Sequence, residues 1–172
     1  MRSTKKVAIS SMLVALGAVL MSVGALFEVV DLAAAAFVSL FIVFAMIEIG
    51  MPYPWLMWLS TSLITFLLFP GKTVWLMYFS FGCFPILKAY IERLPRPTWV
   101  ILKLLYLNIV LVGLYFLVEL IFSVPLVSEG WWMMIAALIL MNAAFLAYDR
   151  MITLAVGYYY DKLRDRIKGL LK

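Results

Sequence analysis

The sequence predicts an all-α integral membrane protein, a single bundle of six transmembrane helices. Three observations predict it: an apolar composition, six apolar runs and a one-sided distribution of charge. The chain has 172 residues, of which 67% are hydrophobic and 13% are charged. Soluble domains are about half apolar and about a quarter charged, so a water-soluble globule is excluded. A transmembrane helix needs about 20 apolar residues, so six of them would occupy nearly the whole chain.

The apolar runs are bounded by charged residues, proline or glycine. They cover residues 7–27, 32–49, 53–69, 73–87, 98–122 and 131–148. The first run is too long and too poorly terminated for a cleaved signal peptide, so we expect it to remain in the mature protein. The second and third runs are separated by Pro52-Tyr53-Pro54, where the fixed φ and missing N–H of proline cost little.

The last three runs are delimited in the same way. The fourth follows Pro70-Gly71 and contains Pro85, which predicts a kink or an end within that helix. The fifth follows Pro95-Arg96-Pro97, and the sixth ends at Asp149-Arg150. The connections are short, so we expect residues 1–150 to form one transmembrane domain.

The charges predict the orientation, because cytoplasmic flanks collect Lys and Arg. Thirteen of the 14 basic residues, all but Lys72, fall at the ends that alternation places on one side. Both termini are therefore predicted to be cytoplasmic. Charged residues also occur near the predicted helix ends on that side, and we expect them to reach water by snorkelling. These residues are Glu48, Lys88, Glu92 and Lys103.

Residues 151–172 form a basic, amphipathic tail. Leu163, Ile167, Leu170 and Leu171 follow the spacing i, i+4, i+7, i+8, which places them on one face of a helix. We expect a short cytoplasmic helix that lies on the anionic inner leaflet or against a cytoplasmic partner.

The residue types present argue against an enzyme. The chain has no histidine and one cysteine, so His-based metal sites and Ser-His or Cys-His catalysis lack a necessary residue. It also lacks a phosphate-binding loop and a Gly-x-Ser-x-Gly elbow. We therefore expect no catalytic residue, metal or cofactor. The excess of basic residues is modest, 14 Lys and Arg against 9 Asp and Glu, so we also expect no nucleic-acid partner.

Polar and aromatic residues near the predicted outer face suggest a small-molecule pocket. Glu119 lies just inside the outer end of its helix, Lys72 opens another, and Asn142 lies mid-helix. Aromatic walls with a few placed charges are typical of ligand sites, and a cation with a carboxylate suits a zwitterionic or anionic ligand with an aromatic part. The candidate ligand-binding residues are Lys72, Trp75, Glu119, Trp131 and Asn142. The alternatives are an aromatic belt with loop charges and, for Asn142 as for Asn108 in the middle of the fifth run, interhelical hydrogen bonding within the bundle.

Small residues form a stripe on the first helix. Ser11, Ala15, Ala18 and Ser22 are spaced by four, three and four residues, and such a stripe lets another helix approach closely. It predicts either packing within the bundle or a docking face for a second membrane subunit.

This architecture, together with the opening Lys5-Lys6-Val7-Ala8-Ile9-Ser10-Ser11-Met12-Leu13-Val14-Ala15-Leu16, resembles the substrate-binding S components of energy-coupling factor (ECF) transporters. The resemblance implies a subunit of the bacterial plasma membrane that captures a micronutrient near the outer face. It also implies docking, through small residues of the first helix, to a transmembrane coupling subunit that carries two ATPases.

Two other similarities leave alternatives open. Phe84-Pro85-Ile86-Leu87-Lys88, with Ile91-Glu92, Lys103 and Asn108, resembles a pattern of small Firmicute membrane proteins, which leaves the ligand open. The size and number of spans also resemble the cell-shape protein MreD, so a non-catalytic membrane scaffold is the alternative function. A scaffold does not need Lys72, Glu119 and the tryptophans to converge on a cavity.

Overall fold

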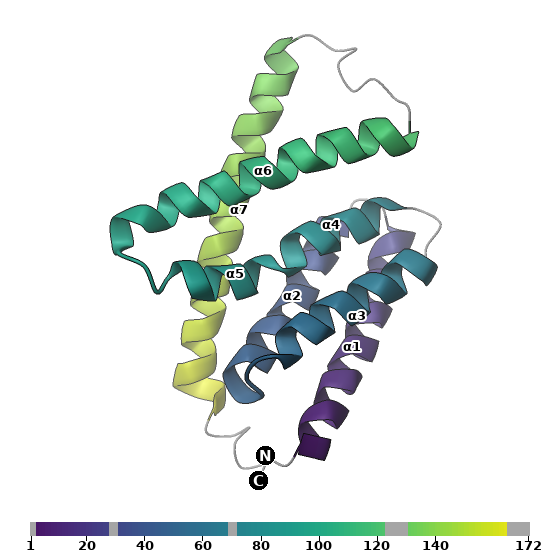
Figure 1. The fold of residues 1–172 in the computed structure, drawn as a ribbon, viewed down its shortest axis with the longest axis vertical. Helices are drawn as coiled ribbons and strands as arrows, with labels where there is room; N and C mark the ends of the chain where they lie inside the picture. The colour runs from purple at the N-terminus through teal and green to yellow at the C-terminus, as the bar shows by residue number, and fades with distance from the viewer. Residues whose placement is uncertain (1–2, 28–30, 69–71, 123–130, 165–172) are drawn as a thin grey trace. The chain divides into compact units, whose positions relative to one another are not determined.

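The structure is a computed structural model that describes residues 3–27, 31–68, 72–122 and 131–164. Within these ranges the secondary structure is entirely helical (Figure 1). The elements are α1 (Ser3–Leu26), α2 (Asp31–Glu48), α3 (Tyr53–Leu68), α4 (Lys72–Gly82), α5 (Phe84–Ile91), α6 (Arg96–Phe122), α7 (Trp131–Tyr158) and the π-helical turn η3 (Tyr159–Leu163).

Five of the apolar segments are long enough to cross a membrane, counted over the described residues. They are Ser3–Leu26, Asp31–Glu48, Val74–Ile91, Arg96–Phe116 and Trp131–Lys162. The remaining predicted span, residues 53–69, corresponds to α3, which is apolar but has only 16 residues. At 1.5 Å per residue α3 measures about 24 Å, less than the roughly 30 Å of bilayer hydrocarbon. The chain therefore has the helices of a multi-pass membrane protein.

The fourth predicted span is broken at Cys83, where α4 ends and α5 begins. Pro85 explains the break, because it has no N–H to donate and its ring clashes with the carbonyl four residues earlier. The N–H groups of Ile86 and Leu87 donate to the Cys83 carbonyl, at 3.1 and 3.2 Å, and so start α5. The predicted kink or end near Pro85 is confirmed.

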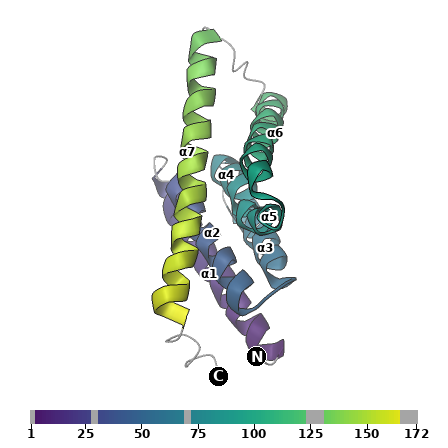
Figure 2. The same cartoon turned by 90° about the vertical axis from the view of Figure 1, so that its left-hand side faces the viewer.

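The sixth predicted span does not end at Tyr148. α7 continues through Asp149-Arg150 to Tyr158 and passes directly into η3 (Figure 2). The helix continues because the charged pair is followed by another apolar stretch, residues 151–156. The first part of the predicted tail therefore extends the helix. The side chains that define its amphipathic face, from Leu163 onward, lie outside the described part of the structure.

The chain forms two compact units, Met1–Ala89 with Ile152–Lys172 and Tyr90–Met151. In the first, α2 packs against α1 and α4, and α3 packs against α1. Its core contains Met21, Ala35, Val38, Ile42, Val74, Tyr78 and Ile86. In the second unit, Leu107 of α6 and Phe145 of α7 are almost completely buried.

Candidate functional site

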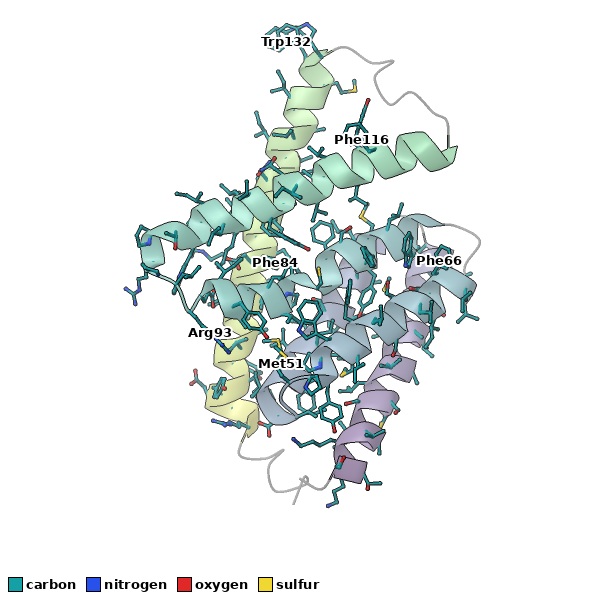
Figure 3. All side chains as sticks on the ribbon, viewed as in Figure 1. Met51, Phe66, Phe84, Arg93, Phe116 and Trp132 are labelled. Atoms are coloured by element: carbon teal, nitrogen blue, oxygen red, sulfur yellow. The ribbon has the colours of Figure 1, made fainter. Side chains whose placement is uncertain are left out.

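Trp75, a predicted ligand-binding residue, lies in a row of aromatic side chains carried by α3 and α4. The row consists of Trp55, Trp58, Phe66, Trp75 and Phe79, with centroids of neighbouring rings 4.9–5.9 Å apart. Trp75 lies between Phe66, labelled in Figure 3, and Phe79. Its indole N–H donates to Ser62 Oγ at 3.0 Å. The row brings together aromatic side chains 24 positions apart in sequence.

The chemistry of this aromatic row follows from its exposure and hydrogen bonds. Phe66 and Phe79 are each more than one-third exposed, so the row presents ring surface outward. The Trp58 indole N–H donates to the Phe79 carbonyl at 3.2 Å, and that of Trp75 is also engaged. A ligand would therefore be recognised here through contact with the rings and not through these two donors.

The remaining predicted ligand-binding residues do not assemble into a described pocket. The side chains of Lys72 and Glu119 lie outside the described part of the structure. Trp131 belongs to the second unit, whereas Trp75 belongs to the first. The five-residue pocket therefore stays a prediction.

Trp131 and its neighbour Trp132 open α7 with their rings in contact, at 3.9 Å between centroids and tilted by 32°. Both side chains are at least 60% exposed, and Figure 3 labels Trp132 at this end of the helix. Exposed tryptophans at a helix end are typical of the membrane–water interface. This geometry matches the aromatic belt that the sequence left as an alternative.

Asn142 forms the interhelical hydrogen bond that the sequence also left as an alternative. Asn108 Nδ2 in α6 donates to Asn142 Oδ1 in α7 at 3.3 Å and to the Leu104 carbonyl at 2.8 Å. Asn142 Nδ2 donates to the Leu138 carbonyl at 2.8 Å. The two amides thus satisfy much of each other's hydrogen-bonding capacity inside an apolar pair of helices.

The predicted docking stripe on α1 is divided between two environments. Ser11 and Ala15 are exposed, Ala18 is buried, and Ser22 is half-buried. The Ser22 hydroxyl donates to the Ala18 carbonyl at 2.8 Å. Only the first half of the stripe is therefore accessible to another helix.

The close approach of α1 to α2 is made by two glycines that the sequence analysis missed. A Cβ at Gly17 would lie 3.0 Å from Val38 Cγ1, and a Cβ at Gly24 would lie 2.8 Å from Ala34 Cβ. Gly17 and Gly24 are seven residues apart, as are Ser10 and Gly17, so the three share one helix face. This heptad spacing is the signal that could have identified them.

Ser11 and Ala15 border a groove of about 340 Å³ between α1 and α3. We call it the α1–α3 groove; its walls include Ser10, Ser11, Ala15, Tyr53, Met57 and Ser60. Ser10 is 8% exposed, and its hydroxyl has no hydrogen-bond partner among the described residues. Close by, Lys6 Nζ donates to the Ile49 carbonyl at 2.8 Å and lies 5.8 Å from the Tyr53 ring centroid.

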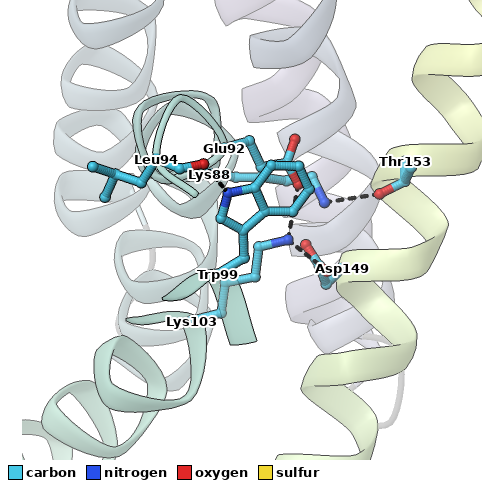
Figure 4. A network of polar contacts seen from close by, with 7 residues as sticks. All are labelled: Lys88, Glu92, Leu94, Trp99, Lys103, Asp149 and Thr153. Carbon is cyan, nitrogen blue, oxygen red and sulfur yellow. Dashed lines mark hydrogen bonds and ion pairs between the residues drawn. The ribbon is translucent and has the colours of Figure 1, made fainter. Parts of the chain in front are cut away.

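The expectation that Lys103 snorkels to water is wrong. Its side chain is only 6% exposed, and Nζ lies 2.8 Å from Glu92 Oε1 and 2.9 Å from Asp149 Oδ2 (Figure 4). Trp99 covers this ion triad at 5.9 Å from Nζ, held by its N–H donating to the Leu94 carbonyl. The expectation failed because Asp149 is 46 residues from Lys103 in sequence.

Two further charged residues are buried as well. In the first unit, Lys88 is 5% exposed and its Nζ donates to Thr153 Oγ1 at 2.8 Å (Figure 4). The Glu48 side chain is 8% exposed, at the end of α2. Lys88 contacts Thr153 and Glu48 contacts Arg164, both far along the chain. Short-range spacing in the sequence does not reveal such contacts.

Over the described residues, no group of three or more Cys, Asp or Glu side chains is placed to hold a metal ion. What the arrangement offers is a ring surface on α3 and α4 and a groove between α1 and α3. Comparison with protein-family models, curated proteins and solved structures finds no match.

Proposed function

We propose that the chain is the substrate-capture subunit of a membrane importer, similar to an ECF S component and without catalysis of its own. The α1–α3 groove carries this proposal, because two of the four predicted docking residues, Ser11 and Ala15, are exposed along it. A small-residue surface on a membrane helix allows another helix to pack closely.

Ser10 adds a chemical reason for a partner at this groove. A buried hydroxyl without a hydrogen bond costs about 1–3 kcal/mol, and a polar group of a partner helix that enters the groove would remove that cost. A transmembrane coupling subunit whose helix offers an acceptor or donor opposite Ser10 would satisfy this hydroxyl. That subunit would bring the two ATPases that supply the energy for import.

The ligand would be captured near the outer face of a bacterial plasma membrane. With both termini cytoplasmic, the start of α4 and the end of α6 face outward. The outer part of the aromatic row, Phe66 and Trp75, would contact an aromatic part of a small molecule, and Lys72 and Glu119 would set its charge preference. A micronutrient that is zwitterionic or anionic fits this combination.

Affinity purification of the tagged full chain in mild detergent tests the proposal. Mass spectrometry of co-purifying proteins and bound metabolites should recover a transmembrane coupling protein with two ATPases, a stoichiometric small molecule, or both. Cell-wall or division proteins with neither of these would contradict the importer and support the scaffold.

A substitution in the groove makes the experiment specific. Ala15→Leu adds bulk to the groove wall and should reduce co-purification of the coupling protein at least about tenfold, a loss of about 1.4 kcal/mol. Ala33→Leu, the same change at an exposed α2 alanine outside the groove, is the matched control. Equal recovery with both variants would exclude the groove as the docking surface.

A further inference from the structure

Three buried polar atoms without hydrogen-bond partners meet where α2 ends beside η3. They are Glu48 Oε1, the Tyr159 hydroxyl and Arg164 Nε, which we call the polar cluster. Glu48 Oε1 and Arg164 Nε are 3.7 Å apart, beyond the 2.7–3.2 Å of an N–H···O hydrogen bond. The Tyr159 hydroxyl interacts with Glu48 but makes no hydrogen bond of normal geometry within the described residues. The cluster therefore offers both donors and an acceptor that the described protein atoms leave unsatisfied.

The π-helical turn η3 builds this cluster. π-Turns are rare, and many occur at functional sites. Here the wide turn places Tyr159 edge-on against Phe44 of α2, at 5.8 Å between ring centroids, and brings Arg164 to Glu48. Tyr159 and Glu48 are both more than nine-tenths buried, so their polar atoms are withheld from bulk water.

An apolar slot of about 190 Å³ lies beside the cluster, between α2 and the end of α7. Tyr159 lines both the slot and the cluster. The other walls include Val43, Phe44, Ile47, Ala155 and Tyr158. Tyr158 and the Arg164 side chain are 56% and 35% exposed, so the site is reachable from outside. A slot for a hydrocarbon chain with polar groups at its end is complementary to an amphiphile.

The charges at this end identify the class of headgroup. Arg164 stacks over Tyr160 at 4.6 Å, and Lys162 lies 5.5 Å from the Tyr158 ring centroid. Within the described residues, these two cations are balanced by Glu48 and the exposed Asp161. The guanidinium of Arg164 is suited to binding phosphate, whereas the carboxylate of Glu48 accepts hydrogen bonds and pairs with an N–H donor. A headgroup with both a phosphate and an N–H donor answers both requirements.

We propose that the slot and the polar cluster bind a phospholipid with a primary ammonium headgroup, phosphatidylethanolamine. Part of one acyl chain occupies the slot, the phosphate accepts from Arg164 and Tyr159, and the ammonium donates to Glu48. The lipid enters as the half-exposed Arg164 side chain turns outward. The slot shares no lining residue with the α1–α3 groove, and the proposal does not depend on the proposed function.

Native mass spectrometry of the delipidated full chain, titrated with matched lipids, tests the proposal. Phosphatidylethanolamine and phosphatidylcholine with the same acyl chains differ in headgroup N–H donors and not in net charge. We expect one retained phosphatidylethanolamine, bound about tenfold more tightly than phosphatidylcholine, because a hydrogen bond to a buried charge is lost with choline. Equal affinities would overturn the proposal.

Three substitutions locate the site, with circular dichroism and thermal unfolding confirming that each variant folds. Ala155→Trp fills the slot and should abolish retention, whereas Ala147→Trp, the same change at an exposed position of α7, should leave it unchanged. Glu48→Gln should remove the preference for ethanolamine, and Arg164→Gln should weaken both lipids. Unchanged retention and preference in all three site variants would also overturn the proposal.

Discussion

Lys103 is a cation enclosed by two carboxylates within an apolar helix. Glu92 and Asp149 both lie within 2.9 Å of its Nζ, so the ion triad has a formal charge of −1. Removing one partner from a buried ion pair leaves an uncompensated charge, which is strongly destabilising. The side chain thus fixes the segment around Glu92 to α7.

We predict that Lys103→Met lowers the free energy of unfolding by about 3 kcal/mol, the lower end of the usual range because Glu92 is one-third exposed. Lys162→Met, at an exposed lysine, is the control and should change stability by less than about 0.5 kcal/mol. Unfolding in mild detergent gives both values. Equal stability of the two variants would show that the triad contributes little.

A second prediction concerns the effect of a substitution at Gly24 on stability. Gly24→Ala places a Cβ 2.8 Å from that of Ala34, and such overpacking should destabilise the protein by about 1–3 kcal/mol. Gly113, also in a helix, has nothing within 4 Å of its Cβ position. Gly113→Ala should therefore be neutral or stabilising by up to about 1 kcal/mol. Thermal unfolding of both variants compares the two sites, and a stabilised Gly24→Ala would contradict the close packing.

The helices differ in how far the sequence predicts them. Long apolar runs predict their presence, because in lipid the backbone groups must bond within the segment. Their ends depend on local chemistry: Pro85 breaks the fourth span, whereas Asp149-Arg150 does not end the sixth. Asp149 is tolerated within α7 because Lys103 neutralises it. The sequence of α7 alone does not show that Lys103 is the partner of Asp149.

The Asn108–Asn142 pair joins α6 to α7 and gives a prediction about these elements. A double-mutant cycle with Asn108→Leu, Asn142→Leu and the double variant should yield a coupling energy of about 0.6 kcal/mol, the average for hydrogen bonds between membrane helices. Equilibrium unfolding in detergent measures all four proteins. Strictly additive effects would mean that the two amides act independently.

For the molecule as a whole, the sequence predicted the all-α membrane class and approximate helix positions from composition and apolar runs. It did not predict the sites, because they depend on residues brought together over long separations. The polar cluster joins Glu48 to Arg164, and the core of α1 uses Gly17 and Gly24 in place of most of the predicted stripe. Short-range spacing carries no signal for such contacts.

The predicted topology concerns the whole chain. Because the chain has a single cysteine, the topology can be tested by labelling cysteines introduced at chosen positions. In a Cys83→Ala background, Ser3→Cys should resist a membrane-impermeant thiol reagent in intact cells, and Ser128→Cys should react. Both positions should react after the cells are permeabilised, which controls for buried thiols. Labelling of Ser3→Cys before permeabilisation would reverse the orientation that the basic residues predict.

The length of α7 has a mechanical consequence. Its 28 residues measure about 42 Å at 1.5 Å per residue, some 12 Å more than the roughly 30 Å hydrocarbon layer. A helix with such hydrophobic mismatch tilts, or one of its ends emerges from the bilayer. A thicker membrane would bring α7 more upright, and a thinner one would incline it. We therefore expect membrane thickness to change how far the end of α7 that carries η3 extends beyond the hydrocarbon layer.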